Sequence, residues 1–374
     1  MQRIISLVLA AILFTGCVPH VELNDRLIIQ AIGIDYKDGE YTVVFQFIPG
    51  GSHSSGGEVS PSAVLNLVSG KGISIVHAIM DIEKKTGKPP LLGSAEVIIL
   101  GGGLKDEPIS YTLDFFSQGY EFHPFIKVAI SETTAEDVLL ALYTDEEVGV
   151  QRLQRVLEDA EHSGLVYDST VHSVNVNMSL PLSGAIIPLF RPTKTTDHEG
   201  KEVRDNLLVG GAVFTDDLYV GDVDLDVMTA LCWLYKTTGA SAVTVDGLLD
   251  SPIAGLWDIK SVITPVRKDD NLHLKIKTTA VAEISRHHAD ENTISKEDEW
   301  AAIIADAMDK QMNRAFEISL HEYGCDVLRL EPLVRQKNNR LWRELHNEFD
   351  TAIRTCTWEF DTDVTILQFG ISAW

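Results

Sequence analysis

A short apolar segment at the start of the chain decides where the folded body can begin. Arg3 is the only charged side chain before an apolar run from Ile4 to Phe14, and small residues precede Cys17. The run is about a dozen residues long, whereas a membrane-spanning helix needs roughly 20. A positive residue, a short apolar core and a small-residue end are typical of a secretory signal. We therefore predict a leader over residues 1–17 and a body that folds outside the cytoplasm.

The end of this leader, Leu13 to Cys17, looks like a bacterial lipobox. In a lipobox a diacylglycerol thioether forms on the cysteine, and cleavage follows just before it. We therefore predict that Cys17 is a lipid-attachment site and the mature N-terminus, since two or three acyl chains hold a protein stably at a membrane. The alternative is an ordinary secreted protein in which Cys17 has no special role.

Length and charge limit the classes of function open to the other 357 of the 374 residues. That length is enough for two or three domains. An apolar content of 45% with 23% charged residues is typical of a globular chain. The formal net charge of −24 repels nucleic acid and anionic lipid headgroups, so we expect neither as the main ligand.

The cysteines beyond the leader do not predict a metal centre or a disulfide framework. Cys232, Cys325 and Cys356 are far apart and form neither a CxxC pair nor a close Cys/His cluster. They allow at most one disulfide, and whether any of them pair is left open. Cys232 lies in an apolar run and is expected to be a buried, inert thiol. We expect no essential disulfide, no metal site and no cofactor.

No catalytic constellation is found in the sequence. Gly101 to Gly103 follow a predicted strand, but they lack the remainder of a phosphate-binding motif, so we interpret them as a tight turn. His287 to Glu291 are interpreted as a solvated loop rather than a metal site, because adjacent residues of a strand point to opposite faces. Asp35, Asp38, Asp216 and Asp217 are assigned to hairpin turns. The sequence therefore does not predict an enzyme.

The first half of the body alternates strands and helices. Residues 27–34 and 41–48 are predicted to form a hairpin through an Asp-Gly turn, and the Gly/Ser-rich stretch 49–61 is a predicted joint between subdomains. Ser74 is predicted to cap a helix that ends near Gly87. The remaining strands predicted for this half are at 96–100, 125–131, 171–180 and 185–190. Three more helices are predicted: one that ends near residue 116, one at 135–143 and one at 146–162.

The polar stretch from Arg191 to Arg204 is the predicted domain boundary. It separates an N-terminal region, 18–200, from a C-terminal domain, 205–374. In the latter we predict a hairpin at 207–220, a buried helix at 225–235, an alternating strand at 272–284, helices at 297–323 and 339–349, and a closing strand at 357–369. The predicted class is a multi-domain α+β fold with mixed, largely antiparallel sheets flanked by helices.

Several local motifs in this order resemble the Ger(x)C proteins, the C subunits of spore germinant receptors. The motifs are Glu22 to Asp25, Ile32 to Asp35, Tyr41 to Gln46, Thr86 to Lys88, Glu96 to Gly101, Gly210 to Phe214, Asp217 to Gly221, Cys325 to Leu328, Leu341-Trp342 and Val364 to Gly370. The resemblance covers nearly the whole mature chain. The chain departs from the family at Ser117 to Glu121, where an arginine-acid pair is usual, and at Cys325, where a small residue is usual.

The resemblance implies a lipoprotein of three mixed α/β domains on the outer face of the inner membrane of a spore. Such subunits work beside an A-type membrane subunit and a B-type, transporter-like subunit, and they have no assigned catalytic residues. We expect a non-enzymatic component of a receptor for nutrient-triggered germination, with Cys17 as the one residue carried over. Which germinant is sensed, and whether this subunit binds it, is left open. The alternative is a lipid-anchored solute-binding protein of a transporter, with two similar lobes around a cleft.

Overall fold

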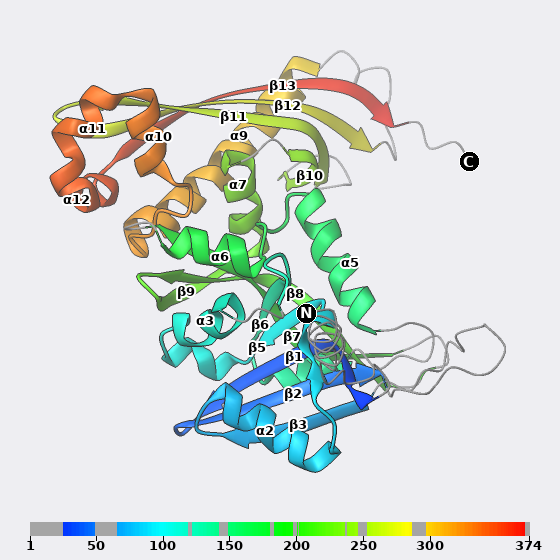
Figure 1. Ribbon diagram of the computed structural model, residues 1–374. Coiled ribbons are helices and arrows are strands. Elements are labelled where there is room, and N and C mark those ends of the chain that lie inside the picture. Colours follow the sequence, from blue (N-terminus) through cyan, green and yellow to red (C-terminus); the bar gives the residue numbers. More distant parts are fainter. Residues whose placement is uncertain are drawn as a thin grey trace, which may run out of the picture.

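The computed structural model contains two β-sheets with helices around and between them (Figure 1). The structure describes residues 25–48, 66–118, 122–141, 149–179, 183–196, 200, 202–235, 238–245, 253–285 and 297–370. Cys17, the predicted joint at 49–61 and the segment His287 to Glu291 lie outside these ranges. Within them the predicted α+β class is confirmed, with mixed sheets flanked by helices.

The first sheet has nine strands in the described chain, in the order β3-β2-β1-β5-β6-β7-β8-β9, with β4 paired to β1. Its four central strands, β1, β5, β6 and β7, run parallel, and antiparallel hairpins extend the sheet on both sides. The strands are β1 (Leu27–Lys37), β2 (Glu40–Ile48), β3 (Asn66–Gly72), β4 (Pro90–Leu91), β5 (Val97–Leu100), β6 (Lys127–Ser131), β7 (Gly184–Thr196), β8 (Glu202–Thr215) and β9 (Leu218–Asp224).

Helices cover both faces of this sheet. One apolar core lies under α2 (Ile75–Thr86), α3 (Ser110–Gln118) and α6 (Val171–Met178). The core on the opposite face lies under α4 (Ala135–Ala141) and α5 (Gly149–His162). Because both faces are covered, the central parallel strands are apolar on both sides, and all four residues of β5 are buried.

The second sheet is built from the C-terminal part of the chain. Its order is β10-β11-β12-β13, and the pairing is antiparallel except between β12 and β13. The strands are β10 (Thr238–Thr244), β11 (Ile253–Lys268), β12 (Asn271–Ser285) and β13 (Thr357–Gly370). The helices of this part are α7 (Leu225–Tyr235), α9 (Glu297–Phe316), α10 (Leu330–Lys337), α11 (Asn339–Leu345) and α12 (Phe349–Arg354).

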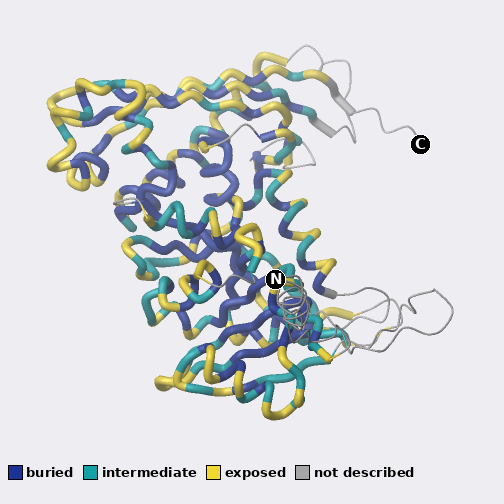
Figure 2. Tube along the Cα trace, in the orientation of Figure 1, coloured by how far each residue is buried: buried dark blue, intermediate teal, exposed yellow. Residues whose placement is uncertain are grey.

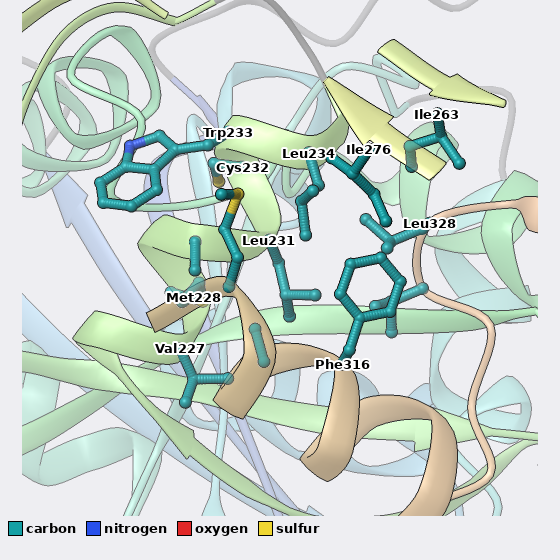
Figure 3. Packing of buried hydrophobic residues seen from close by; sticks show 14 of the residues in the cluster. Val227, Met228, Leu231, Cys232, Trp233, Leu234, Ile263, Ile276, Phe316 and Leu328 are labelled. Atoms are coloured by element: carbon teal, nitrogen blue, oxygen red, sulfur yellow. The ribbon is translucent and has the colours of Figure 1, made fainter. Parts of the chain in front are cut away.

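A single core joins the two sheets around α7. Its residues from Val227 to Leu234 are all buried, and they pack with Ile276 of the second sheet and Phe316 of α9 in one cluster (Figure 3). The Trp233 indole N–H donates to the Ser241 hydroxyl at 2.9 Å, which satisfies its polar atom. Figure 2 shows buried residues along the central strands and around α7. The predicted buried helix is therefore confirmed.

Many local predictions are confirmed where a short-range signal specifies the structure. The hairpin of β1 and β2 turns at Asp38-Gly39, both of which have positive φ. Ser74 caps α2 by accepting the N–H of His77, and Gly87 ends the helix in the left-handed conformation. The predicted helix at 297–323 is α9 followed by a π-helical segment, Glu317–Glu322.

One predicted strand is a helix in the structure. Residues 171–180 were expected to be a strand, but 171–178 form α6, capped by the Thr170 hydroxyl, which accepts the N–H of Ser173. The stretch 191–204 was predicted to be a domain boundary; in the structure β7 extends to Thr196 and β8 begins at Glu202, so the two strands form a long hairpin there. The polar residues there lie on strands that project beyond the buried part of the sheet.

Candidate functional site

The parallel strands β1, β5 and β6 end side by side, and the loops after them surround an open cleft of about 1050 Å³. Backbone hydrogen bonds tie these loops together: the Gly101 N–H donates to the Ile34 carbonyl at 2.7 Å, and the Gly102 N–H to the Thr133 carbonyl at 2.7 Å. Ligands of open sheets with parallel strands bind outside the carboxyl ends of those strands. This cleft is therefore the candidate functional site.

Asp35 lies at the inner wall of the cleft, and its assignment to a hairpin turn is wrong. It lies within β1, and its Oδ1 accepts the N–H of Ala135, at 2.9 Å. Burial raises the pKa of this carboxyl to about 6, opposed by backbone hydrogen bonds from Ala135 and Glu136. Asp35 of β1 thus forms a hydrogen bond with the first turn of α4, 100 residues later in the chain.

The three glycines after β5 form a tight turn, as the sequence predicted. They open a short 3₁₀ helix, Gly102–Asp106, rather than a phosphate-binding loop. A Cβ on Gly101 would lie 1.7 Å from Oδ1 of Asp35, and one on Gly103 would lie 2.3 Å from the Tyr36 carbonyl oxygen. Close backbone approach explains both glycines, and the Asp35 carboxylate would repel a phosphate at this position.

The rim of the cleft is mainly acidic. Two lysines, Lys37 and Lys71, accompany a larger set of acidic side chains; these are Asp38, Glu40, Asp106, Glu107 and Glu136. The described lining contains neither histidine nor cysteine. Two of its three threonine hydroxyls donate to Asp137, Thr133 at 2.9 Å and Thr134 at 2.7 Å. The cleft therefore offers hydrogen bonds and negative charge to a ligand, and its described lining holds no nucleophile paired with an imidazole base.

Cys232, Cys325 and Cys356 are thiols rather than disulfide partners in the described structure, and all three are buried. Burial raises the pKa of Cys325 and of Cys356 to about 12. A thiol with so high a pKa is almost entirely protonated near neutral pH and is a poor nucleophile. The expectation that Cys232 is a buried thiol is confirmed. Among the described residues, no group of three or more His, Cys, Asp or Glu is arranged to hold a metal ion.

The Cys325-Asp326 motif connects the two sheets. Asp326 is fully buried, and its two carboxyl oxygens accept the N–H groups of Leu330, at 2.8 Å, and Glu331, at 3.1 Å. Burial raises the pKa of this carboxyl to about 6, opposed by these backbone hydrogen bonds. A β-bridge joins Asp326 to Ser183, which precedes β7. The motif therefore has a structural role, and sequence reasoning missed it because the contacts to Ser183 and the first sheet are non-local.

No helix of the described chain combines the length and the apolar character needed to cross a membrane.

Lys127 forms a largely buried ion pair with Glu161, at 2.6 Å, between β6 and α5. This pair and the Asp35 contact fix the two helices that cover one face of the first sheet.

Comparison with known proteins agrees with this architecture. Residues 19–192 match the family model of the spore germination protein N-terminal domain, and residues 209–370 match that of the spore germination B3/GerAC-like C-terminal domain. A solved structure entitled "Crystal Structure of the GerBC protein" is similar with a TM-score of 0.55 and 16% identity, covering 90% of this chain and 97% of that chain. A search of curated proteins gives no match.

The fold is thus a two-sheet α+β architecture that is similar to the GerBC structure over 90% of this chain. The two family models together account for most of the chain. The chain belongs to the Ger(x)C family of spore germination proteins.

Proposed function

We propose that this protein is a lipid-anchored, non-enzymatic C subunit of a spore germinant receptor. The observation that carries the proposal is the family match over residues 19–192 and 209–370, which begins directly after the lipobox-like segment ending at Cys17. Its task is to assemble with an A-type membrane subunit and a transporter-like B-type subunit, and to help convert nutrient binding into germination. We place it on the outer face of the inner membrane of the spore.

A membrane anchor suits a protein of this kind for a physical reason. Acyl chains on Cys17 would confine the body to two dimensions, which raises its effective concentration near membrane partners without a spanning helix. The acidic cleft and the protonated, buried thiols favour binding and assembly over group transfer. The division of the chain into regions 18–200 and 205–374, with a joint near 49–61, belongs to this proposal.

Replacement of the anchor residue tests the proposed function. In a spore-forming host, Cys17→Ala is expected to move the protein from the membrane fraction to the soluble fraction and to abolish the nutrient response, because the lipidated sulfur is lost. His20→Ala is the matched control, since it alters the same segment and leaves the cysteine in place. Protein levels are compared by immunoblot. Normal germination of spores that carry Cys17→Ala at wild-type level would refute the proposal.

The alternative, a solute-binding protein, receives less support from the fold. That class has two similar lobes around a ligand cleft, whereas the described chain combines a nine-stranded mixed sheet with a four-stranded sheet of different order. A thermal-shift screen against amino acids and sugars separates the two functions. A large and reproducible rise in Tm with one solute would favour the alternative.

A further inference from the structure

The outer side of α2 carries an apolar stripe. The helix buries Ile75, Ala78, Ile79 and Ile82 against the first sheet. On the opposite side, Val76 is 52% exposed and Met80 47%, and Ile73, in the connection just before the helix, is 78% exposed. The spacing of four residues brings Val76 and Met80 onto one face of the helix, and Ile73 adjoins its N-terminal end. Single exposed apolar residues are common on protein surfaces, but a continuous stripe on one helix indicates a contact surface.

The same face becomes basic toward the C-terminal end of the helix. Lys84 is exposed in the last turn, next to Lys85, which pairs with Asp81 at 2.8 Å. Between residues 75 and 88 the chain has three lysines against two acidic residues, a net charge of +1, although the whole chain carries −24. We call Ile73, Val76, Met80 and Lys84 the α2 outer face. Apolar residues next to lysines with long flexible stems are typical of helices that lie at a lipid interface.

The path of the chain brings the predicted anchor to this helix. The Leu27 N–H donates to the Pro89 carbonyl at 3.0 Å, so β1 begins beside the loop that directly follows α2. Ten residues lead from Cys17 to Leu27, and an extended chain of that length spans at most about 35 Å. Figure 1 shows α2 at the end of the molecule farthest from the second sheet. A lipid on Cys17 would thus keep the start of β1, and the C-terminal end of α2 beside it, within about 35 Å of the bilayer.

We propose that the α2 outer face docks on an anionic phospholipid surface, with its apolar stripe among the headgroups and Lys84 against their phosphates. This inference rests on the proposed lipid anchor. The rest of the surface carries the strong negative charge of the chain and is repelled by the same lipids, so attraction and repulsion together orient the body. The second sheet then points away from the membrane.

Site-specific fluorescence tests the docking. A chain of residues 18–374, which lacks Cys17, is tethered to vesicles through a hexahistidine segment and a chelating lipid, so the result does not depend on natural acylation. An environment-sensitive dye is attached at Met80→Cys, while the native cysteines stay unlabelled because they are buried. The control is Val262→Cys, a site of similar exposure on the second sheet (53%).

With phosphatidylglycerol-containing vesicles, the dye at position 80 is expected to shift to the blue and to be quenched by nitroxide lipids, whereas the dye at position 262 is not. Lys84→Glu is expected to reduce the quenched fraction several-fold, and Lys268→Glu on β11 is expected to leave it unchanged. Equal signals in buffer and on vesicles would overturn the proposal and assign the stripe to a protein partner. A blue shift without vesicles that grows with protein concentration would also overturn it, in favour of a second copy of this chain.

A failure of docking is distinguishable from a failure of the proposed function. Loss of the anchor is read from fractionation of the Cys17→Ala protein, whereas docking is read from the dye on a tethered chain. Quenching at position 80 that requires anionic lipid supports the inference in either case.

Discussion

Replacement of Asp326 by asparagine should change how the stability of the protein depends on pH. Asp326 is fully buried, and burial raises the pKa of its carboxyl from 3.8 to about 6. The group binds its proton more tightly in the folded than in the unfolded state. Its protonation therefore stabilises the fold at low pH, and this contribution disappears as the pH rises through the window between 3.8 and about 6.

The size of the effect follows from the shift in pKa. A difference between 3.8 and about 6 corresponds to roughly 3 kcal/mol at about 1.4 kcal/mol per pH unit. Asparagine does not titrate, and its amide group replaces one of the two oxygens that accept the N–H groups of Leu330 and Glu331. The unpaired N–H costs about 1–3 kcal/mol. We therefore expect Asp326→Asn to be less stable than wild type at pH 4 and equal to it, or more stable, at pH 8.

Urea unfolding followed by tryptophan fluorescence measures this change, since Trp233 lies in the same core as the residues next to Asp326. With an m-value near 3 kcal/mol/M, the gap between the midpoints of variant and wild type should change by about 1 M between pH 4 and pH 8. Asp35, whose carboxyl pKa is also raised to about 6 by burial, is present in both proteins, so its effect cancels.

The matched control is Asp216→Asn, which removes one negative charge from an exposed hairpin turn that asparagine also tolerates. If the free-energy gap between Asp326→Asn and wild type has the same sign and size at both pH values, burial does not control the titration of this carboxyl. The reasoning about the Cys325-Asp326 motif would then be refuted.

Two further outcomes follow from close packing. Gly101→Ala places a Cβ 1.7 Å from Oδ1 of Asp35 and should lower the Tm by roughly 5–15 °C. Gly239→Ala, whose added Cβ has no atom within 4 Å, should lower the Tm far less. Equal Tm values of the two variants by differential scanning calorimetry would contradict the steric argument. The three buried thiols should resist a thiol reagent in the native protein and react in denaturant, and rapid labelling of the folded chain would show that they are accessible.

Local signals in the sequence were sufficient for the elements that short-range chemistry specifies. Ser74 and Gly87 mark the two ends of α2 because their hydrogen bonds lie within a few residues of the chain. Asp38-Gly39 specifies a tight turn because both residues tolerate positive φ. The alternating pattern of β12 predicted its buried face, on which Leu272, Leu274 and Ile276 lie.

Two predictions were wrong because tertiary contacts determine the structure at those positions: the hairpin turn assigned to Asp35 and the strand assigned to residues 171–180. The acceptor oxygen of Asp35 and its donor at Ala135 are 100 residues apart, so no local pattern relates them. The valines of α6 alternate with polar residues as in a strand, but Val171 and Val174, three positions apart, are the two that the core buries. The hydroxyl of Thr170 caps the first turn and favours the helix.

The strand β11 was missed in the sequence because a β-bulge interrupts its alternation of buried and exposed residues. Its buried residues fall at even positions up to Leu256 and at odd positions from Ile259, because a bulge between Trp257 and Lys260 inserts an extra residue. Pro265 argues further against a strand, yet β10 pairs with β11 only as far as Ile259, so the proline lies where no ladder partner needs its N–H. Such a strand is recognised only once its neighbours are known, since the bulge and the end of pairing are properties of the sheet.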